Sequence, residues 1–93
     1  MNITGRKILT DLSAAHADVR EAVSAWTKEV ENAQWKTPSE LKARYPTVSF
    51  VNEYVVFNLK GNRYRLRVLI DFALGIVVVD RAGTHAEYDS WSF

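Results

Sequence analysis

Apolar side chains change their spacing at Val48, and this change limits the folds open to the chain. Before Val48, the apolar residues of 8–12 and 19–33 recur with the period of about 3.6 residues that is typical of an amphipathic helix. After it, β-branched and aromatic residues alternate with period two in four segments separated by turn residues: 48–51, 54–59, 63–72 and 76–82. Neighbouring strands joined by short loops pair antiparallel. The spacing therefore predicts an α+β domain, with helices first and an antiparallel sheet of three to four strands second.

Short motifs predict where the helices begin and end. A break at residues 16–17 separates two N-terminal helices, and Asp18–Glu21 resembles a capping box for the second. Thr37–Glu40 has an N-cap threonine, a proline at the first helical position and a glutamate at the third, so a short third helix begins there and ends before Pro46. Thr84–Glu87 forms another capping box, which predicts a short C-terminal helix.

Length and composition indicate one soluble domain, residues 1–93, with no cofactor. Fractions of 47% hydrophobic and 25% charged residues exclude a disordered tail, a collagen-like repeat and a coiled coil. The absence of cysteine excludes a disulfide scaffold and a thiolate nucleophile, and two histidines alone make no zinc site, so we expect no metal. The apolar runs, 68–70 and 76–79, are far shorter than the roughly 20 residues of a membrane helix. We expect a cytoplasmic protein without membrane contact.

The turn at Gly61-Asn62 predicts the register of the two longest strands, because it would place Lys60 opposite Arg63. One face then carries only apolar side chains and must pack under all three helices: Val55, Phe57, Leu59, Tyr64, Leu66, Val68, Ile70 and Phe72. The opposite face collects Asn58, Lys60, Arg63, Arg65 and Arg67. A shift of one residue would bury three arginines, so the alternation fixes the register.

Basic side chains are concentrated in the middle of a chain whose net charge is only +1. Residues 36–67 carry seven basic and two acidic side chains, whereas acidic side chains outnumber basic ones before and after this segment. Arg63, Arg65 and Arg67, the arginine ladder, form either a solvated face or a phosphate-binding surface. We favour phosphate binding, because no carboxylate lies between Asn58 and Arg67 to neutralise the ladder. An RNA or DNA backbone is the obvious ligand.

His85, Tyr88 and Asp89 are spaced to share one face of the C-terminal helix. A histidine at such a position is more often a polar surface residue, but imidazole exchanges protons near neutral pH and a tyrosine can hold or protonate a phosphate oxygen. His85 is therefore the candidate for proton transfer. His16, in the predicted helix break, is structural or solvent-facing.

The aromatic residues have structural interpretations first. Trp26 lies on the apolar stripe of the second helix and should be in the core, and Trp35 should close one edge of that core. Trp91 and Phe93 either cap the sheet or remain exposed as a partner contact.

The segments 56–66 and 83–89, together with Trp35-Lys36-Thr37-Pro38 before a short helix, resemble the HigB family of toxins from bacterial toxin–antitoxin systems, within the RelE superfamily. The resemblance spans nearly the whole chain. It implies a RelE-like fold and a metal-free endoribonuclease that cleaves mRNA, commonly in the ribosomal A site. It also implies a HigA-type helix-turn-helix antitoxin as partner, through which alone the protein would contact DNA. In such enzymes the 2′-OH of the substrate attacks the adjacent phosphate, which leaves a cyclic or 3′-phosphate and a 5′-OH end.

The resemblance also implies roles for residues. His85 would transfer the proton, Tyr88 would position or protonate the phosphate, and the basic side chains would stabilise the developing charge. The implied catalytic set is His85, Arg65, Arg67, Lys60 and Tyr88. The implied RNA-binding set is Asn58, Lys60, Asn62, Arg63, Arg65, Arg67 and Arg81.

The sequence departs from the family pattern just before Gly83, where a basic or aromatic residue is usual and Asp80-Arg81 stands here. Either one phosphate contact is lost, or it has moved to Arg81, or Asp80 tethers an arginine of the ladder. Two rival functions also follow from the residues. One is a non-cleaving RNA- or ribosome-binding module of the same fold, and the other is an interaction protein whose basic face docks an acidic partner.

Overall fold

The structure, a computed structural model, describes residues 1–93. The elements along the chain are β1 (Asn2–Thr4), α1 (Arg6–Ala15), a 3₁₀ turn η1 (Ala17–Val19), α2 (Arg20–Asn32), α3 (Pro38–Arg44), β2 (Ser49–Val51), β3 (Tyr54–Leu59), β4 (Tyr64–Asp71), β5 (Ile76–Thr84) and α4 (His85–Tyr88). Apart from β1 and α4, the helices precede the strands, and this segregation confirms the predicted α+β class. No helix has both the length and the apolar character needed to cross a membrane.

Five strands form one sheet in the order β1-β5-β4-β3-β2. The hairpin of β3 and β4 has the predicted register, with Leu59 opposite Tyr64 and Asn58 opposite Arg65. The prediction of three to four strands was wrong, because β1 adds a fifth strand that pairs parallel to β5. This strand has three residues, of which only Ile3 is buried, so it carries no period that could be recognised.

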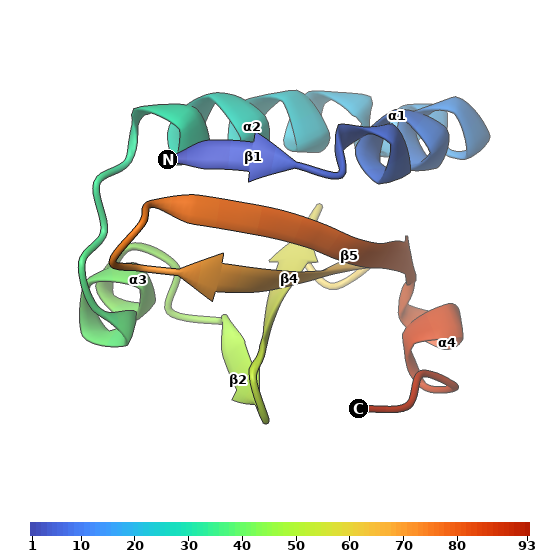
Figure 1. Cartoon of the computed structure of the whole chain (residues 1–93). Coiled ribbons are helices and arrows are strands. Elements are labelled where there is room, and N and C mark those ends of the chain that lie inside the picture. Colours follow the sequence, from blue (N-terminus) through green and yellow to red (C-terminus); the bar gives the residue numbers. More distant parts are fainter.

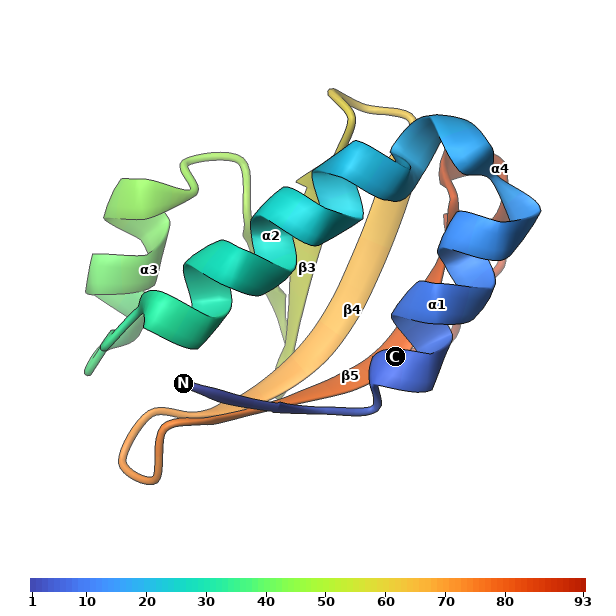
Figure 2. The ribbon, with the colours of Figure 1, turned by 90° about the horizontal axis from the view of Figure 1, so that it is seen from above.

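The helices α1 and α2 lie across one face of the sheet, and α3 lies beside β2 and β3 (Figures 1 and 2). The apolar face of the β3–β4 hairpin packs under them as predicted, with Phe57, Leu66 and Val68 almost fully buried. Trp26 of α2 belongs to the same core and is 2% exposed. Trp35 packs against the edge of that core, also as predicted.

Two of the three predicted helix caps are present. The backbone N–H of Glu40 donates to Thr37 at the start of α3, and the Thr84–Glu87 capping box begins α4. The Asp18–Glu21 box was wrong, because η1 occupies that position and α2 begins without a side-chain cap. Asp18 instead accepts a hydrogen bond of 2.6 Å from the Tyr64 hydroxyl. This bond lowers the pKa of Asp18 and raises that of Tyr64.

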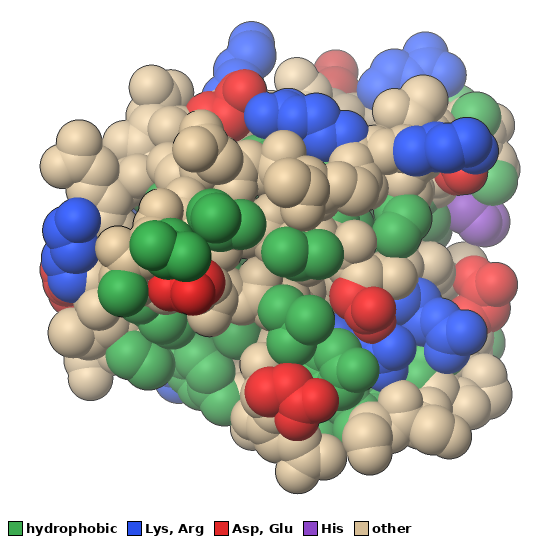
Figure 3. All heavy atoms as spheres, in the orientation of Figure 1, with side chains coloured by type: hydrophobic (Ala, Val, Ile, Leu, Met, Phe, Trp, Pro, Cys, Tyr) green, Lys and Arg blue, Asp and Glu red, His purple; other side chains and the backbone are tan.

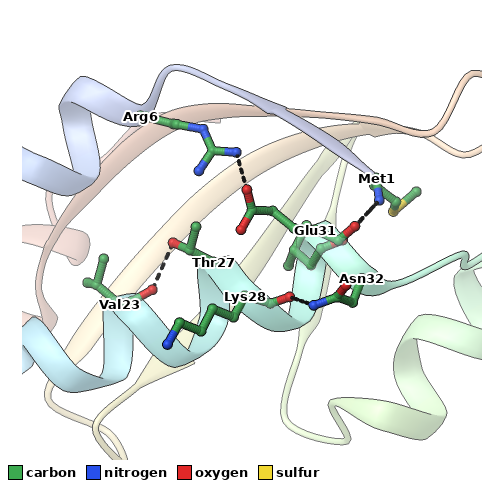
Figure 4. A network of polar contacts seen from close by, with 8 residues as sticks. Met1, Arg6, Val23, Thr27, Lys28, Glu31 and Asn32 are labelled. Carbon is green, nitrogen blue, oxygen red and sulfur yellow. Dashed lines mark hydrogen bonds and ion pairs between the residues drawn. The ribbon is translucent and has the colours of Figure 1, made fainter.

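The first strand is fastened to the end of α2. The Met1 ammonium donates to the carbonyls of Val30, Glu31 and Ala33 at 2.9–3.1 Å (Figure 4). These carbonyls lie at the helix C-terminus, where backbone oxygens lack intrahelical partners and a positive charge is favourable. Arg6 adds an ion pair of 2.9 Å to Glu31. The N-terminal end of α1 is thereby joined to the C-terminal end of α2.

We predict that Trp26→Ala lowers the free energy of unfolding by about 3–5 kcal/mol, the usual cost of emptying a large aromatic site. The Trp26 ring packs edge-on against Phe57, with centroids 5.5 Å apart, and its indole N–H is buried without a partner. Trp26→Phe should therefore cost less than the loss of volume alone suggests, since it also removes that unpaired donor. Urea denaturation measures both variants, and an alanine cost under about 1 kcal/mol would contradict the core placement.

Candidate functional site

The second face of the sheet is covered by the C-terminal segment, residues 85–93, which comprises α4 and the five residues after it. Figure 1 shows this segment leaving the end of β5 on the side away from α1 and α2. Val56, on this face, is 2% exposed although it lies outside the main core cluster. The molecule therefore has a second, smaller buried layer, which the sequence analysis described only as a basic face.

Two arginines of the ladder are buried in this layer. Arg65 is 8% exposed and Arg67 is 7% exposed, so the alternative of a solvated face was wrong for these two arginines. Covering by the C-terminal segment is the reason, because strand alternation alone would have left both side chains in solvent. In the view of Figure 3, basic and acidic side chains lie together over the part of β4 and β5 near α4, with hydrophobic side chains around them.

Arg67 is neutralised by Asp80. Its Nε and Nη2 atoms both lie 2.6 Å from the same carboxylate oxygen. Arg67 pairs with Arg81 and Val68 with Val79, so Asp80 is the extra residue of a β-bulge and its carboxylate is aimed at β4. The hypothesis that Asp80 tethers an arginine of the ladder is confirmed. The claim that no carboxylate neutralises the ladder was wrong, since it considered only residues near in sequence.

Arg65 has no carboxylate partner. Its Nη1 donates to the carbonyls of Asn62 and Tyr64, at 3.1 and 3.4 Å, and its Nη2 donates to the side-chain oxygen of Asn62 at 2.7 Å. The guanidinium carbon lies 5.3 Å from the centroid of the Tyr88 ring, a cation–π contact. These acceptors are all neutral, so Arg65 keeps an uncompensated charge. Its Nε and the second N–H of Nη2 make no hydrogen bond within the protein.

Lys60 and Arg63 lie elsewhere. The predicted Gly61-Asn62 turn is present, with Arg63 N–H donating to the Lys60 carbonyl at 3.4 Å. The side chains, however, contact Asp18 of η1: Lys60 Nζ donates to its carbonyl at 3.0 Å, and Arg63 lies 3.7 Å from its carboxylate. The prediction that both share a face with Arg65 was therefore wrong. Lys60 and Arg63 belong to the turn between β3 and β4, so the alternation of side chains along a strand does not determine which face they lie on.

Helix α4 brings His85 and Tyr88 to the edge of the buried layer. His85 N–H donates to the Arg63 carbonyl at 2.9 Å, and His85 Nδ1 lies 3.7 Å from the Asp89 carboxylate, as the predicted shared face requires. Hydrogen bonds from Thr84 lower the pKa of Glu87 in the capping box. The imidazole of His85 is half-exposed and open to a ligand from solvent.

Gly83 allows this helix to sit so close to the sheet. A Cβ atom at Gly83 would lie 3.0 Å from the Glu87 carboxylate and 3.2 Å from the Trp91 ring. The absence of a side chain at the end of β5 therefore gives room for both the cap and the ring.

The structure thus places Tyr88 over Arg65, with Asn62 holding Arg65 and Asn58 opposite it on β3, and His85 begins the same short helix as Tyr88. Arg81 is exposed on β5 opposite Arg67, with its guanidinium carbon 5.5 Å from the centroid of the Trp91 ring. Tyr54, which was not among the predicted site residues, also contributes: its ring centroid lies 4.4 Å from the guanidinium of Arg67. Trp91 and Phe93 both lie against Arg67, as the capping alternative predicts, although Phe93 remains 40% exposed. No group of three or more histidine, aspartate or glutamate side chains is placed to hold a metal ion.

Residues 19–91 match the family model HigB toxin, described as the RelE-like toxic component of a toxin–antitoxin system. The chain belongs to the HigB toxin family. It is 25% identical over 92 residues to the mRNA interferase toxin HigB of Escherichia coli strain K12. The aligned region covers 96% of this chain and 88% of that relative. The mRNA interferase HigB proteins of Escherichia coli O157:H7 and Shigella flexneri show the same identity and coverage. Membership of the HigB family implies an antitoxin partner.

We predict that Thr84→Ala raises amide exchange in residues 85–91 about fivefold, equivalent to the ~1 kcal/mol that an N-cap contributes. The matched variant Thr37→Ala removes the cap of α3 and should leave this exchange unchanged.

The same cap depends on pH, because the pKa of Glu87 is lowered in the folded state. The stabilisation by the cap is complete above the ordinary glutamate pKa of about 4.3, and it is lost as pH falls through the lowered pKa. Equal exchange in wild type and Thr84→Ala would contradict the anchoring role.

Proposed function

We propose that this HigB-family toxin is an endoribonuclease that cleaves mRNA in the ribosomal A site and so inhibits translation. The observation that carries the proposal is the buried, unneutralised charge of Arg65, which lies under the Tyr88 ring and within one short helix of His85. A buried cation without a counter-ion is costly in a folded protein, and an anionic ligand would offset that cost. The names of the relatives, mRNA interferases, support RNA as that ligand.

In this proposal Arg65 binds the scissile phosphate. Its two free N–H groups can donate to phosphate oxygens, while Asn62 holds the guanidinium in place from the other side. As the 2′-OH attacks, negative charge grows on the phosphate, and a fixed guanidinium in a water-poor site stabilises that charge more than water would. Arg81, exposed on β5, adds a second contact to the RNA backbone.

His85 transfers the proton. Attack by the 2′-OH releases one proton, and the departing 5′-oxygen takes one up, so the products are a 2′,3′-cyclic phosphate and a 5′-OH end; later addition of water to the cyclic phosphate gives a 3′-phosphate. His85 is half-exposed at the start of α4, and Tyr88 lies one turn later over Arg65. The tyrosine hydroxyl is thereby available to position or protonate a phosphate oxygen. Side chains alone supply the chemistry in this proposal.

The remaining partners follow the family. A HigA-type helix-turn-helix antitoxin silences the toxin and carries any contact with DNA, and the ribosome presents the mRNA in the cytoplasm. The whole of residues 1–93 acts as one toxin domain, since β1, which precedes the matched residues, completes the same sheet.

We predict that His85→Ala lowers the rate of cleavage on programmed ribosomes by about 10²–10⁴, the usual contribution of a general acid–base group. Binding of RNA or ribosomes should fall much less, because Arg65 and Arg81 remain. The control is the other histidine, His16, whose ring packs against Tyr64 on the helix side of the sheet. The variant His16→Ala should cleave at the wild-type rate. Mapping of 5′-OH ends measures the reaction. A wild-type chain that binds RNA but produces no new ends would establish the non-cleaving module instead.

We predict that Arg65→Gln weakens binding to RNA of any sequence and reduces the salt dependence by roughly one phosphate contact. Arg20→Gln removes the same charge from an exposed position at the start of α2 and is the control, since α2 lies on the opposite face of the sheet. Filter binding at several salt concentrations gives both slopes. The phosphate assignment fails if the two variants have the same affinity and slope.

A further inference from the structure

We infer that Arg67 is a positioning residue, which uses Asp80 and the last residues of the chain to hold Tyr88 over Arg65, and is not a phosphate ligand. The role in catalysis rests on the proposed function, whereas the role in holding the segment rests on contacts alone. Four observations support the inference.

First, the charge of Arg67 is already compensated. The Asp80 carboxylate lies 2.6 Å from both Nε and Nη2, and the Arg67 side chain is only 9% exposed. A phosphate would have to displace or repel this carboxylate in order to bind. Arg65, which lies two residues earlier on the same face, has no such obstacle. Arg67 therefore has a carboxylate partner within the protein, and Arg65 has none.

Second, Arg67 binds the C-terminal segment directly. Its Nη1 donates to the Ser92 carbonyl at 2.8 Å. The rings of Phe93 and Trp91 lie 5.0 and 5.5 Å from its guanidinium, and that of Tyr54 lies 4.4 Å away on β3. A guanidinium among aromatic rings makes favourable cation–π contacts, and these strengthen out of water. The segment therefore has its largest set of polar and aromatic contacts at Arg67.

Third, the contacts continue to Tyr88. Its ring packs edge-on against Trp91, with centroids 5.4 Å apart, and against Phe93 at 6.0 Å. The chain of contacts thus runs from Asp80 through Arg67 and the two rings to Tyr88, and from Tyr88 to Arg65.

Fourth, α4 cannot hold this position by itself. It has four residues, and an isolated helix of one turn is unstable in water. The Thr84 cap fixes its first residue, and its other end is held by the contact of Tyr88 with Arg65 and by the contacts of residues 91–93. Without Arg67 the helix would remain attached at Thr84, but Tyr88 would be free to leave Arg65.

The alternative, that Arg67 is a phosphate ligand restrained by Asp80, predicts the opposite effect of one substitution. Asp80→Asn would then release Arg67, tighten RNA binding and steepen its salt dependence. If Arg67 positions the segment, Asp80→Asn loosens residues 88–93 and leaves RNA affinity and its salt dependence unchanged.

The experiment compares wild type with Asp80→Asn, Arg67→Gln and the charge control Arg20→Gln. Three quantities are measured: amide exchange of residues 85–93, the salt dependence of RNA binding, and the kcat and KM of cleavage. We expect faster exchange and a kcat lower by roughly tenfold or more in the first two variants, with KM and the salt slope unchanged, because the phosphate ligand remains and only its companion is misplaced. Tighter binding with a steeper slope in Asp80→Asn would overturn the inference, and so would unchanged exchange in both variants.

A variant lacking residues 91–93 covers the case in which Arg67→Gln fails to fold, because it keeps the Arg67–Asp80 pair and the helix-side core. It should show the same faster exchange and lower kcat, and wild-type values there would refute the inference. The exchange measurement needs no cleavage. If wild type does not cleave RNA, the proposed function fails, while exchange still decides whether Arg67 holds the segment.

Discussion

Alternation of side chains along β4 is the constraint on which both layers of this domain depend. Leu66 and Val68 point into the core under the helices and are completely buried, so Arg65 and Arg67 must point the other way. Covering them buries two cations, which requires a partner for each. Arg67 receives a carboxylate from a bulge in β5, whereas Arg65 receives only neutral oxygens. The charge of Arg67 is therefore compensated within the protein, whereas the charge of Arg65, on the same face of β4, has no counter-ion and can attract an anionic ligand.

Features encoded locally were predictable from the sequence. The register of β3 and β4 follows from the alternation of apolar and basic residues, and the caps at Thr37 and Thr84 follow from motifs of four residues. The core position of Trp26 follows from the helical period. Each of these depends on neighbours within one or two elements, where the spacing of side chains is fixed by backbone geometry.

Features that depend on distant segments were missed or misassigned. Asp80 is 13 residues from Arg67 and reaches it only because β5 has an extra residue at that point. The pairing of β1 with β5 joins residues more than 70 positions apart, and three residues give too little pattern to predict it. Lys60 turned toward Asp18 because both belong to turns, where no period applies. The basic middle of the chain is consequently divided: Arg44 pairs with Glu29, and Lys60 and Arg63 lie at η1. Lys60 and Arg63 therefore do not extend the basic surface around Arg65.

The place of β5 in the sheet has a consequence during synthesis. This strand is late in the sequence but lies between β1 and β4, so the first strand has no partner until residues 76–84 have been made. Asp80, His85 and Tyr88 follow in the same stretch. Because chains are made from the N-terminus and domains fold as units, a nascent chain that stops before Ile76 contains Arg65 and Arg67 without the residues that cover and complete them. The ribosome that translates this chain is therefore exposed to the proposed activity only after β5 and α4 have been added.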